Sequence, residues 1–254
     1  MGAPPLRFAV TALDATDSTQ SEVQRLAAAG APEGTVVTAR HQRAGRGRRG
    51  HEWWDAPGES LLASVLLRPE GSAGSVPQLS LVGGLAGAEA LAEAAAVEAR
   101  IRWPNDLVVD GRKVCGILAE AASDGTGRPT HVILGIGVNL NQTAFPEPLA
   151  ERATSLRLLT GRAQDPERIL AALLGHLGRR YAAWRSGGFA ALRRAWLERS
   201  MLPGQVVRLL DGSVGEGVDV GDDGVLLARG RDGRMARVLS GAAAEEGTAH
   251  AARD

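Results

Sequence analysis

The sequence predicts an α+β fold: a mixed β-sheet packed with helices, followed by a small C-terminal β-barrel. Two observations predict it. Up to residue 201, strand-like and helical segments follow one another irregularly rather than in repeated strand–helix–strand units. From residue 202 the chain reads as four or five short strands separated by turns that contain Gly and Asp. We therefore expect a main domain over residues 1–201, a β-domain over residues 202–243, and a disordered tail over residues 244–254.

Each element of the main domain has its own signal. The run 17–30 reads as a helix, with Thr19 and Glu22 spaced as a capping box and Gly30 as its C-terminal stop. The dipeptide 110–111, Asp-Gly between two alternating apolar runs, predicts a tight hairpin. In chain order we expect strands over 7–13, 35–40, 60–67, 99–109, 112–121 and 130–141, and helices over 17–30, 76–97, 165–184 and 189–200.

Composition narrows the classes of protein to which the chain can belong. Its 254 residues suffice for one sizeable core plus a small appendage, and Lys+Arg and Asp+Glu each number 29, so no overall basicity points to nucleic acid. The single cysteine, Cys115, excludes an internal disulfide. No signal-peptide pattern opens the chain, and no run of about 18 apolar residues is present to span a membrane. We expect a soluble cytoplasmic protein.

The stretch "GRGRRG" (residues 45–50) matches the glycines of the G-x-G-x-x-G dinucleotide fingerprint. That fingerprint needs a helix after it, but "HEWWDAPG" carries a Pro-Gly pair and shows no helical periodicity, so we reject a dinucleotide site. Two interpretations remain: an exposed loop in an arginine-rich protein, or a mobile loop that binds anions. Glycine lets the backbone approach a ligand closely, while guanidinium groups suit carboxylates and phosphates. The loop supplies Arg43, Arg46, Arg48 and Arg49.

A second cluster lies in "RWPNDLVVDGRKVCG" (residues 102–116). Pro104 favours extended geometry in the residue before it, so Asn105 and Asp106 are expected at a turn where a strand ends. The predicted hairpin then returns Lys113, the only lysine of the chain, to the same region. A purely structural interpretation also stands, because Asn-Asp after proline makes a good turn and a lysine on a half-buried strand can extend to solvent.

Two further stretches place polar groups beside small residues. In "DSTQ", Ser18 and Thr19 both suit a helix N-cap, and since capping needs only one of them, a hydroxyl is left for a ligand. In "GIGVNL", two residues of a predicted strand before Asn139 are glycines without a side chain. By themselves these glycines indicate only that another group packs closely against the strand. The histidines form no H-E-x-x-H pair, Cys115 has no thiol partner, and no G-x-S-x-G elbow occurs. Neither a zinc site nor a serine nucleophile is expected.

Taken in order, "DST", "QRAGRGRRG…W", "RWPNDL", "RKVCGIL" and "GIGVNLN" resemble the biotin–protein ligase family, from about Asp17 to Asn141. The resemblance implies a catalytic fold shared with class II aminoacyl-tRNA synthetases and an SH3-like C-terminal domain. It also implies two half-reactions. Biotin and Mg-ATP give biotinyl-5′-AMP and pyrophosphate, and a lysine of a biotin carboxyl carrier domain then attacks the mixed anhydride.

Site residues follow from the resemblance by motif position. It implies catalytic roles for Lys113, Arg46 and Arg48. It implies biotin binding by Ser18, Thr19, Gln20, Gln42, Arg46, Gly47, Arg48, Trp53, Lys113 and Gly116. It implies binding of ATP and the adenylate by Arg46, Arg48, Arg49, Trp53, Arg102, Asn105, Asp106, Lys113 and Asn139. Mg²⁺ would lie beside Asn105 and Asp106.

Two departures from the family pattern affect these expectations. Arg102 stands where the family usually has lysine, so a planar fork replaces a point charge. Fewer than 20 residues precede "DSTQ", which leaves no room for the DNA-binding domain that some members carry. The sequence therefore predicts a ligase without repressor function or specific DNA binding, acting on the carrier domain of acetyl-CoA carboxylase or a related carboxylase.

Two rival functions remain at the level of sequence. A lipoate–protein ligase shares the fold and chemistry, although its motifs should differ at "GRGRRG" and "WPND". A nucleic-acid-binding module could use the arginine loop and the β-barrel, but balanced charge and 4% aromatic residues argue against stacking platforms. The sequence does not distinguish a monomer from a homodimer.

Overall fold

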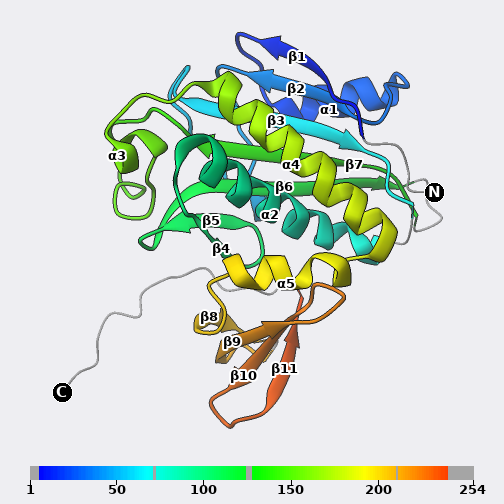
Figure 1. Ribbon diagram of the computed structural model, residues 1–254, viewed down its shortest axis with the longest axis vertical. Helices are drawn as coiled ribbons and strands as arrows, with labels where there is room; N and C mark the ends of the chain where they lie inside the picture. The colour runs from blue at the N-terminus through cyan, green and yellow to red at the C-terminus, as the bar shows by residue number, and fades with distance from the viewer. Residues whose placement is uncertain (1–5, 71–72, 124–127, 210, 240–254) are drawn as a thin grey trace.

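The computed structural model describes residues 6–70, 73–123, 128–209 and 211–239. Its largest element is a seven-stranded mixed sheet with the strand order β1-β2-β3-β7-β6-β5-β4 (Figure 1). Only β1 and β2 pair in parallel; the other neighbours are antiparallel. The strands are β1 (Ala9–Leu13), β2 (Thr35–Ala39), β3 (Ser60–Leu67), β4 (Arg100–Arg102), β5 (Asp106–Val109), β6 (Arg112–Ser123) and β7 (Pro129–Asn139).

Helices cover the two faces of this sheet unequally (Figure 1). On one face lies α2 (Val76–Ala95), buried along most of its length between the sheet and α4 (Pro166–Gly187). On the opposite face, α1 (Thr19–Ala28) packs Val23 against Leu66 and Ile133 of the sheet. Because α1 is short, it leaves part of its face of the sheet for a ligand pocket.

Most of the predicted elements are confirmed. The stretch expected as one strand over 99–109 is instead two strands, β4 and β5, which pair antiparallel on either side of a turn. The hairpin turn forms at Asp110 and Gly111, both with positive φ, as a tight β5–β6 connection requires. Gly30 ends α1 with a φ of 87°, as expected. The structure adds α3 (Leu156–Thr160) and two 3₁₀ turns, at Arg48–Gly50 and Ala73–Ser75, which are too brief to show a periodicity in the sequence. The helix α5 (Ala190–Arg199) was expected.

The predicted capping box of α1 is wrong. The N-cap residue is Ser18, one position earlier than expected, and its side chain makes no capping bond. The Thr19 hydroxyl instead contacts the side chains of Gln42 and Ser64, and the carboxylate of Glu22 accepts a hydrogen bond from the Thr16 hydroxyl. The polar groups that the sequence assigned to capping are therefore used in tertiary contacts.

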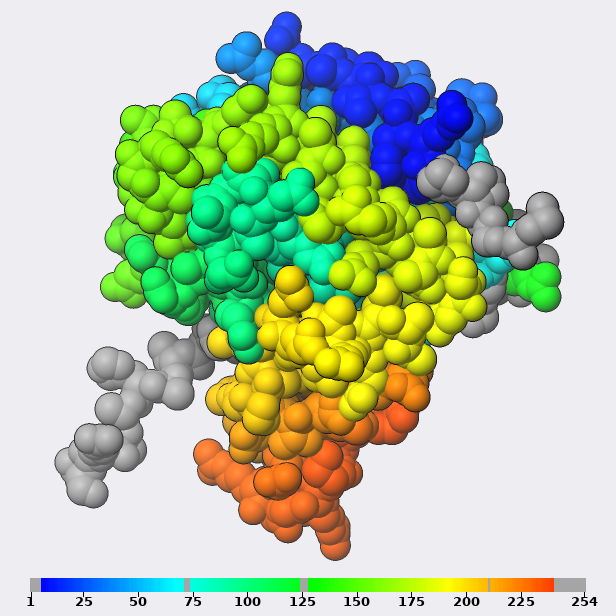
Figure 2. All heavy atoms as spheres, viewed as in Figure 1, coloured from blue at the N-terminus to red at the C-terminus, as the bar shows by residue number. Residues whose placement is uncertain are grey.

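A second, four-stranded antiparallel sheet with the order β11-β10-β9-β8 forms a lobe beyond α5 (Figure 2). It is joined to the main sheet at the β4–β5 turn, because the Gln205 side chain donates to the Trp103 carbonyl at 2.6 Å and accepts from the Trp103 N–H at 2.8 Å. The predicted short strands are confirmed, while the boundaries at 202 and 243 stay a prediction and the tail 244–254 lies outside the described residues. The strands are β8 (Gln205–Arg208), β9 (Val214–Val220), β10 (Leu226–Gly230) and β11 (Met235–Val238).

Within the described ranges, every helix is too short or too polar to cross a lipid bilayer.

Candidate active site

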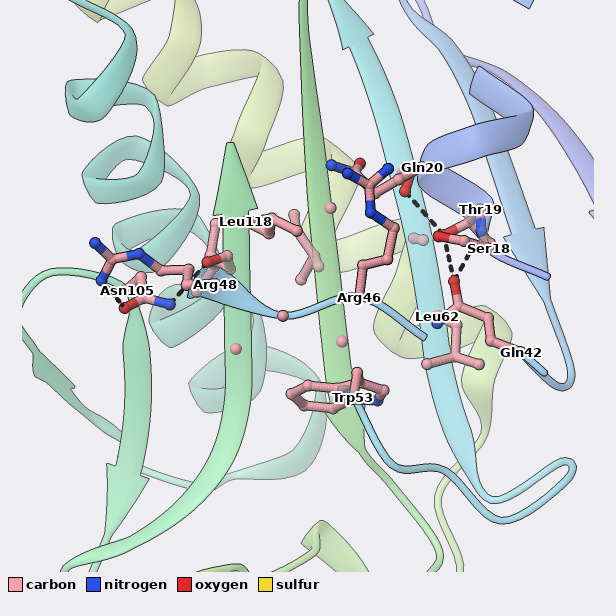
Figure 3. A pocket seen from close by; sticks show the side chains of 18 of the residues that line it. Ser18, Thr19, Gln20, Gln42, Arg46, Arg48, Trp53, Leu62, Asn105 and Leu118 are labelled. Atoms are coloured by element: carbon pink, nitrogen blue, oxygen red, sulfur yellow. Dashed lines mark hydrogen bonds between the residues drawn. The ribbon is translucent and has the colours of Figure 1, made fainter. Parts of the chain in front are cut away.

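The floor of the first pocket is the α1 face of the central sheet (Figure 3). Strand register places Leu62, Gly137 and Gly116 in one row across β3, β7 and β6, and Ser64, Gly135 and Leu118 in the next row. Side chains alternate between the faces of a strand, so these six residues share one face. Three of the six are glycines, which leaves space above the sheet.

One wall of the pocket is the N-terminus of α1 together with Gln42. The Gln42 Oε1 atom accepts two hydrogen bonds from Thr19, from its N–H at 2.8 Å and from its hydroxyl at 3.0 Å (Figure 3). Since Oε1 is used twice, Nε2 is the end of the Gln42 amide that remains for a ligand, as a donor. The Ser18 hydroxyl is buried and finds no hydrogen-bond partner in the described part of the chain.

The roof of the pocket is the loop that carries "GRGRRG" and Trp53. The Trp53 N–H donates to the Gly45 carbonyl at 3.0 Å, which folds the loop back over the sheet. The indole lies directly on the two facing glycines: a β-carbon would be 2.8 Å from the ring at Gly116 and 2.7 Å at Gly137. Only glycine at both positions permits this contact. The Trp53 Nε1 atom is buried without a partner among the described residues.

Lys113 enters the pocket because of an irregularity in β6. The register of β5 and β6 shifts between Leu107 and Val108, so that Leu107 faces Cys115 and Val108 faces Lys113. Residues three apart on a regular strand point to opposite faces, and the extra residue of the bulge brings Lys113 to the same face as Gly116. A β-carbon on Gly116 would be 2.9 Å from the Lys113 Nζ atom.

Cations and one carboxylate meet at this end of the pocket. Lys113 Nζ lies 2.6 Å from Asp106 Oδ1, as an ion pair without hydrogen-bond alignment, and 5.4 Å from the centre of the Trp53 ring. Arg102 donates to Asp106 Oδ2 at 3.0 Å. Arg48 donates to Asn105 Oδ1 at 2.9 Å, and burial, followed by the neighbouring Arg49 guanidinium, lowers the pKa of Arg48.

Arg46 points toward the opposite end of the pocket, away from Lys113. Its guanidinium donates to Glu120 Oε1 at 2.6 Å, and Gln20 Nε2 donates to Glu120 Oε2 at 2.9 Å. Sequence reasoning missed Glu120. The signal that could have found it is its spacing: it lies four residues after Gly116 on the same strand, and therefore on the same face. In this structure Arg46 and Arg48 lie at opposite ends of the pocket.

A second cavity of about 540 Å³ adjoins the first, which measures about 60 Å³. Lys113, Arg48 and Trp53 line both cavities and so form the boundary between them. The larger cavity is rich in cationic side chains, and Gln205 and Val206 of the C-terminal sheet close one side of it. Its cations are Arg48, Arg49, Arg102, Lys113 and Arg152.

Almost every residue expected in the site lines one of these cavities. Asn139 does not: its amide donates to the backbone carbonyls of Thr154 at 2.9 Å and Lys113 at 3.4 Å, beneath the site. The first cavity is lined by Ser18, Thr19, Gln20, Gln42, Arg46, Gly47, Arg48, Trp53, Asn105, Lys113 and Gly116. The second adds Arg49, Arg102 and Asp106.

The described residues of the site include neither a preformed cluster of metal ligands nor a reactive thiol. Within the described ranges, no group of three or more His, Cys, Asp or Glu residues is arranged to hold a metal ion. Asp106, the carboxylate expected beside Mg²⁺, is already paired with Lys113 and Arg102. Burial raises the pKa of Cys115 to about 12, so its thiol stays protonated and is a poor nucleophile.

Two joined cavities with cations at their boundary are suited to hold two anionic groups next to each other. Residues 12–139 match the biotin/lipoate A/B protein ligase family, and the chain belongs to this family. It is 40% identical over 230 residues to the biotin–[acetyl-CoA-carboxylase] ligase of Paracoccus denitrificans, covering 87% of this chain and 94% of that protein.

Other relatives agree with this assignment. The bifunctional ligase/repressor BirA of Bacillus subtilis is 35% identical over 225 residues, covering 87% of this chain and 69% of BirA. The biotin protein ligase of Aquifex aeolicus, solved in complex with biotin and ATP, superimposes with a TM-score of 0.79 at 31% identity, covering 92% of this chain and 96% of that one. The expected family and catalytic fold are thus confirmed.

Proposed function

We propose that this protein is a biotin–protein ligase, which converts biotin and ATP to biotinyl-5′-AMP and then transfers the biotinyl group to a lysine of a carboxylase carrier domain. The observation that carries the proposal is the pair of adjoining cavities with Lys113 and Arg48 at their boundary. Two relatives support the choice of substrates. The relative from Paracoccus denitrificans is named a biotin–[acetyl-CoA-carboxylase] ligase, and the Aquifex aeolicus ligase was solved with biotin and ATP bound.

The first cavity suits the bicyclic head of biotin. Gln42 offers a donor and the unpartnered Ser18 hydroxyl offers an acceptor, which complement the carbonyl and N–H groups of a cyclic urea. Trp53 and Leu62 supply apolar surface on either side. A cavity of about 60 Å³ holds only a few water molecules, so the roof loop must move to admit biotin.

The cationic boundary accounts for the first half-reaction. A biotin carboxylate oxygen must bond to the α-phosphorus of ATP while the bond from that phosphorus to pyrophosphate breaks. Lys113 and Arg48 offset the repulsion between the two anions and stabilise the charge that develops on the phosphorus. In the structure Lys113 is paired with Asp106, so binding of the anions involves exchange of that partner.

In the second half-reaction the roof must open so that the carrier lysine can reach the acyl phosphate. The carrier lysine amine forms an amide bond with the biotinyl carbonyl carbon, and AMP leaves. Until the carrier arrives, Trp53 and the arginine loop would shield the anhydride from water. Mg²⁺ would arrive with ATP and be bound mainly by its phosphates. Asp106 alone would be a poor metal ligand, because it is already paired with two cations, Arg102 and Lys113.

Lipoate is the alternative substrate within the family, and it is not favoured, because the relatives from Paracoccus denitrificans and Aquifex aeolicus are biotin ligases. The test measures pyrophosphate release from ATP in the presence of biotin or lipoate. We expect release with biotin only, followed by biotinylation of an apo carrier domain that avidin detects. Release with lipoate but not with biotin would refute the assignment.

A further inference from the structure

The far end of the first pocket, opposite Lys113, contains a carboxylate to which the sequence assigned no role. Glu120 marks this end, on the same face of β6 as Gly116 and about 13 Å along the strand from it. Its two carboxylate oxygens are shared between two side chains. Arg46 donates to one of them at 2.6 Å, and Gln20 Nε2 donates to the other at 2.9 Å.

These contacts determine which way the Gln20 amide faces. An ionised carboxylate only accepts hydrogen bonds, so the Nε2 group of Gln20 must point at Glu120. The Ile133 carbonyl, at 3.5 Å, is a second and weaker acceptor for the same group. The Oε1 atom must therefore face the other side, and it lies above Gly135, on the pocket floor, where a β-carbon would be 3.0 Å from it.

Gln20 Oε1 is consequently a buried acceptor directed at the pocket. The residue is 4% exposed, and Oε1 has no hydrogen-bond partner in the described part of the chain. A buried polar atom without a partner is unfavourable, and a ligand N–H would satisfy it. The Arg46–Glu120 pair is half exposed and contributes little to stability, so the main effect of Glu120 passes through Gln20.

We propose that Glu120 is a positioning residue that gives the pocket its preference for a head group with an N–H donor. By holding Nε2, it keeps the Gln20 carbonyl turned toward the ligand. A ureido ring supplies the missing donor, whereas a dithiolane ring of similar size would leave the carbonyl unpaired and be rejected. This inference rests on the proposed function, because it names a residue that shapes the biotin end of the same site.

Two substitutions of Glu120 test the role of its acceptors. Glu120→Gln has one acceptor for two donors, and Glu120→Ala has none. We expect the KM for biotin in pyrophosphate release to rise about tenfold in Glu120→Ala, the factor expected for one lost hydrogen bond, and by less in Glu120→Gln. The kcat and the KM for ATP should stay within about twofold, because Lys113 and the second cavity are unchanged.

A matched control is Glu198→Gln on α5. It removes the same charge from an exposed Arg–Glu pair, Arg194–Glu198 at 3.0 Å, away from both cavities, and should behave as wild type. Gln20→Ala should raise the KM for biotin by a factor similar to that of Glu120→Ala, and it tests the same contact if the Glu120 variants do not fold. Adding Glu120→Ala to Gln20→Ala should then have no further effect.

The outcomes separate this inference from the proposed function. If the wild-type protein releases no pyrophosphate with biotin, the proposed function fails. If the wild type is active but the KM for biotin is unchanged in Glu120→Ala or in Gln20→Ala, the inference is wrong. Additive effects in the double variant, or an equal loss of kcat and of ATP affinity, would also overturn it.

Discussion

Gly116 and Gly137 are direct register partners on β6 and β7, and the indole of Trp53 rests on both of them. Gly116 belongs to the motif "RKVCGIL" and Gly137 to "GIGVNLN", and the pairing of their strands places them side by side on the sheet. Because neither has a β-carbon, the ring reaches the backbone of the sheet and closes the first pocket from above. The contact explains why small residues are needed in both strands.

Gly137→Ala should therefore displace Trp53. The new β-carbon would be 2.7 Å from the indole, which cannot yield as a flexible side chain would, so the roof of the pocket must shift. We expect the KM for biotin to rise at least ~10-fold, with a loss of about 1–3 kcal/mol in unfolding free energy from overpacking.

The control for this substitution is Gly175→Ala on α4. Its β-carbon would meet only the tip of Arg179, at 3.7 Å, and alanine favours the helix. Its KM for biotin should equal that of the wild type. A normal KM in Gly137→Ala as well would show that Trp53 does not form the roof of the biotin pocket.

Lys113→Ala should strongly reduce adenylate formation and leave the fold intact. The lysine lies at the boundary of the two cavities, and without it Asp106 keeps its contact with Arg102. We expect a loss of at least ~10²-fold in the rate of pyrophosphate release, the scale observed when one preorganised donor is removed. Thermal unfolding checks the fold, and normal pyrophosphate release from a folded variant would contradict the assignment of Lys113.

Arg102→Lys should leave ATP binding nearly unchanged, whereas Arg102→Ala should weaken it. The Arg102 Nη2 group donates to Asp106 Oδ2 at 3.0 Å, a contact that an ammonium group can also make. We expect the KM for ATP to stay within about threefold in Arg102→Lys and to rise at least ~10-fold in Arg102→Ala. If lysine behaves like alanine, then the planar fork is required and the family's usual residue no longer fits this site.

The sequence predicted the elements that have strong local signals. The Asp110-Gly111 turn, the stop at Gly30 and the long apolar run of α2 all appear where expected, because each follows from the residues themselves. The capping box was wrong because Thr19 has better partners across the fold. Local patterns cannot show such competition, since the competing groups lie more than twenty residues away.

The site was predictable where it is built from contiguous motifs. Residues such as Lys113 and Arg48 stood out by type or setting, and both lie where the two cavities meet. Glu120 was missed because one glutamate in an alternating strand has no distinctive signal until Gln20 and Arg46 are brought to it. The position of Asn139 beneath the site likewise depends on the packing of distant segments.

The last prediction concerns the arginine loop in the absence of ligands. Arg43 and Arg46 contact Asp17 and Glu120 only through exposed ion pairs, which contribute little to stability. Arg49 has a φ of 55°, a conformation that non-glycine residues seldom adopt. Limited trypsinolysis should therefore cut the ligand-free protein within residues 43–50, giving fragments of roughly one-fifth and four-fifths of the 254 residues.

Ligands should protect this loop in a defined order. Biotinyl-5′-AMP would provide a phosphate for the guanidinium groups and a surface on which Trp53 can close, converting a mobile loop to an ordered one. Biotin with Mg-ATP should slow the cut strongly, biotin alone should slow it partly, and NAD should have no effect. Cleavage after Arg162, in the exposed turn that follows α3, serves as the internal control and should be equally fast in every case. If the cut within residues 43–50 is as fast with biotin and ATP as without them, the loop does not close on an adenylate, and its arginines have another use.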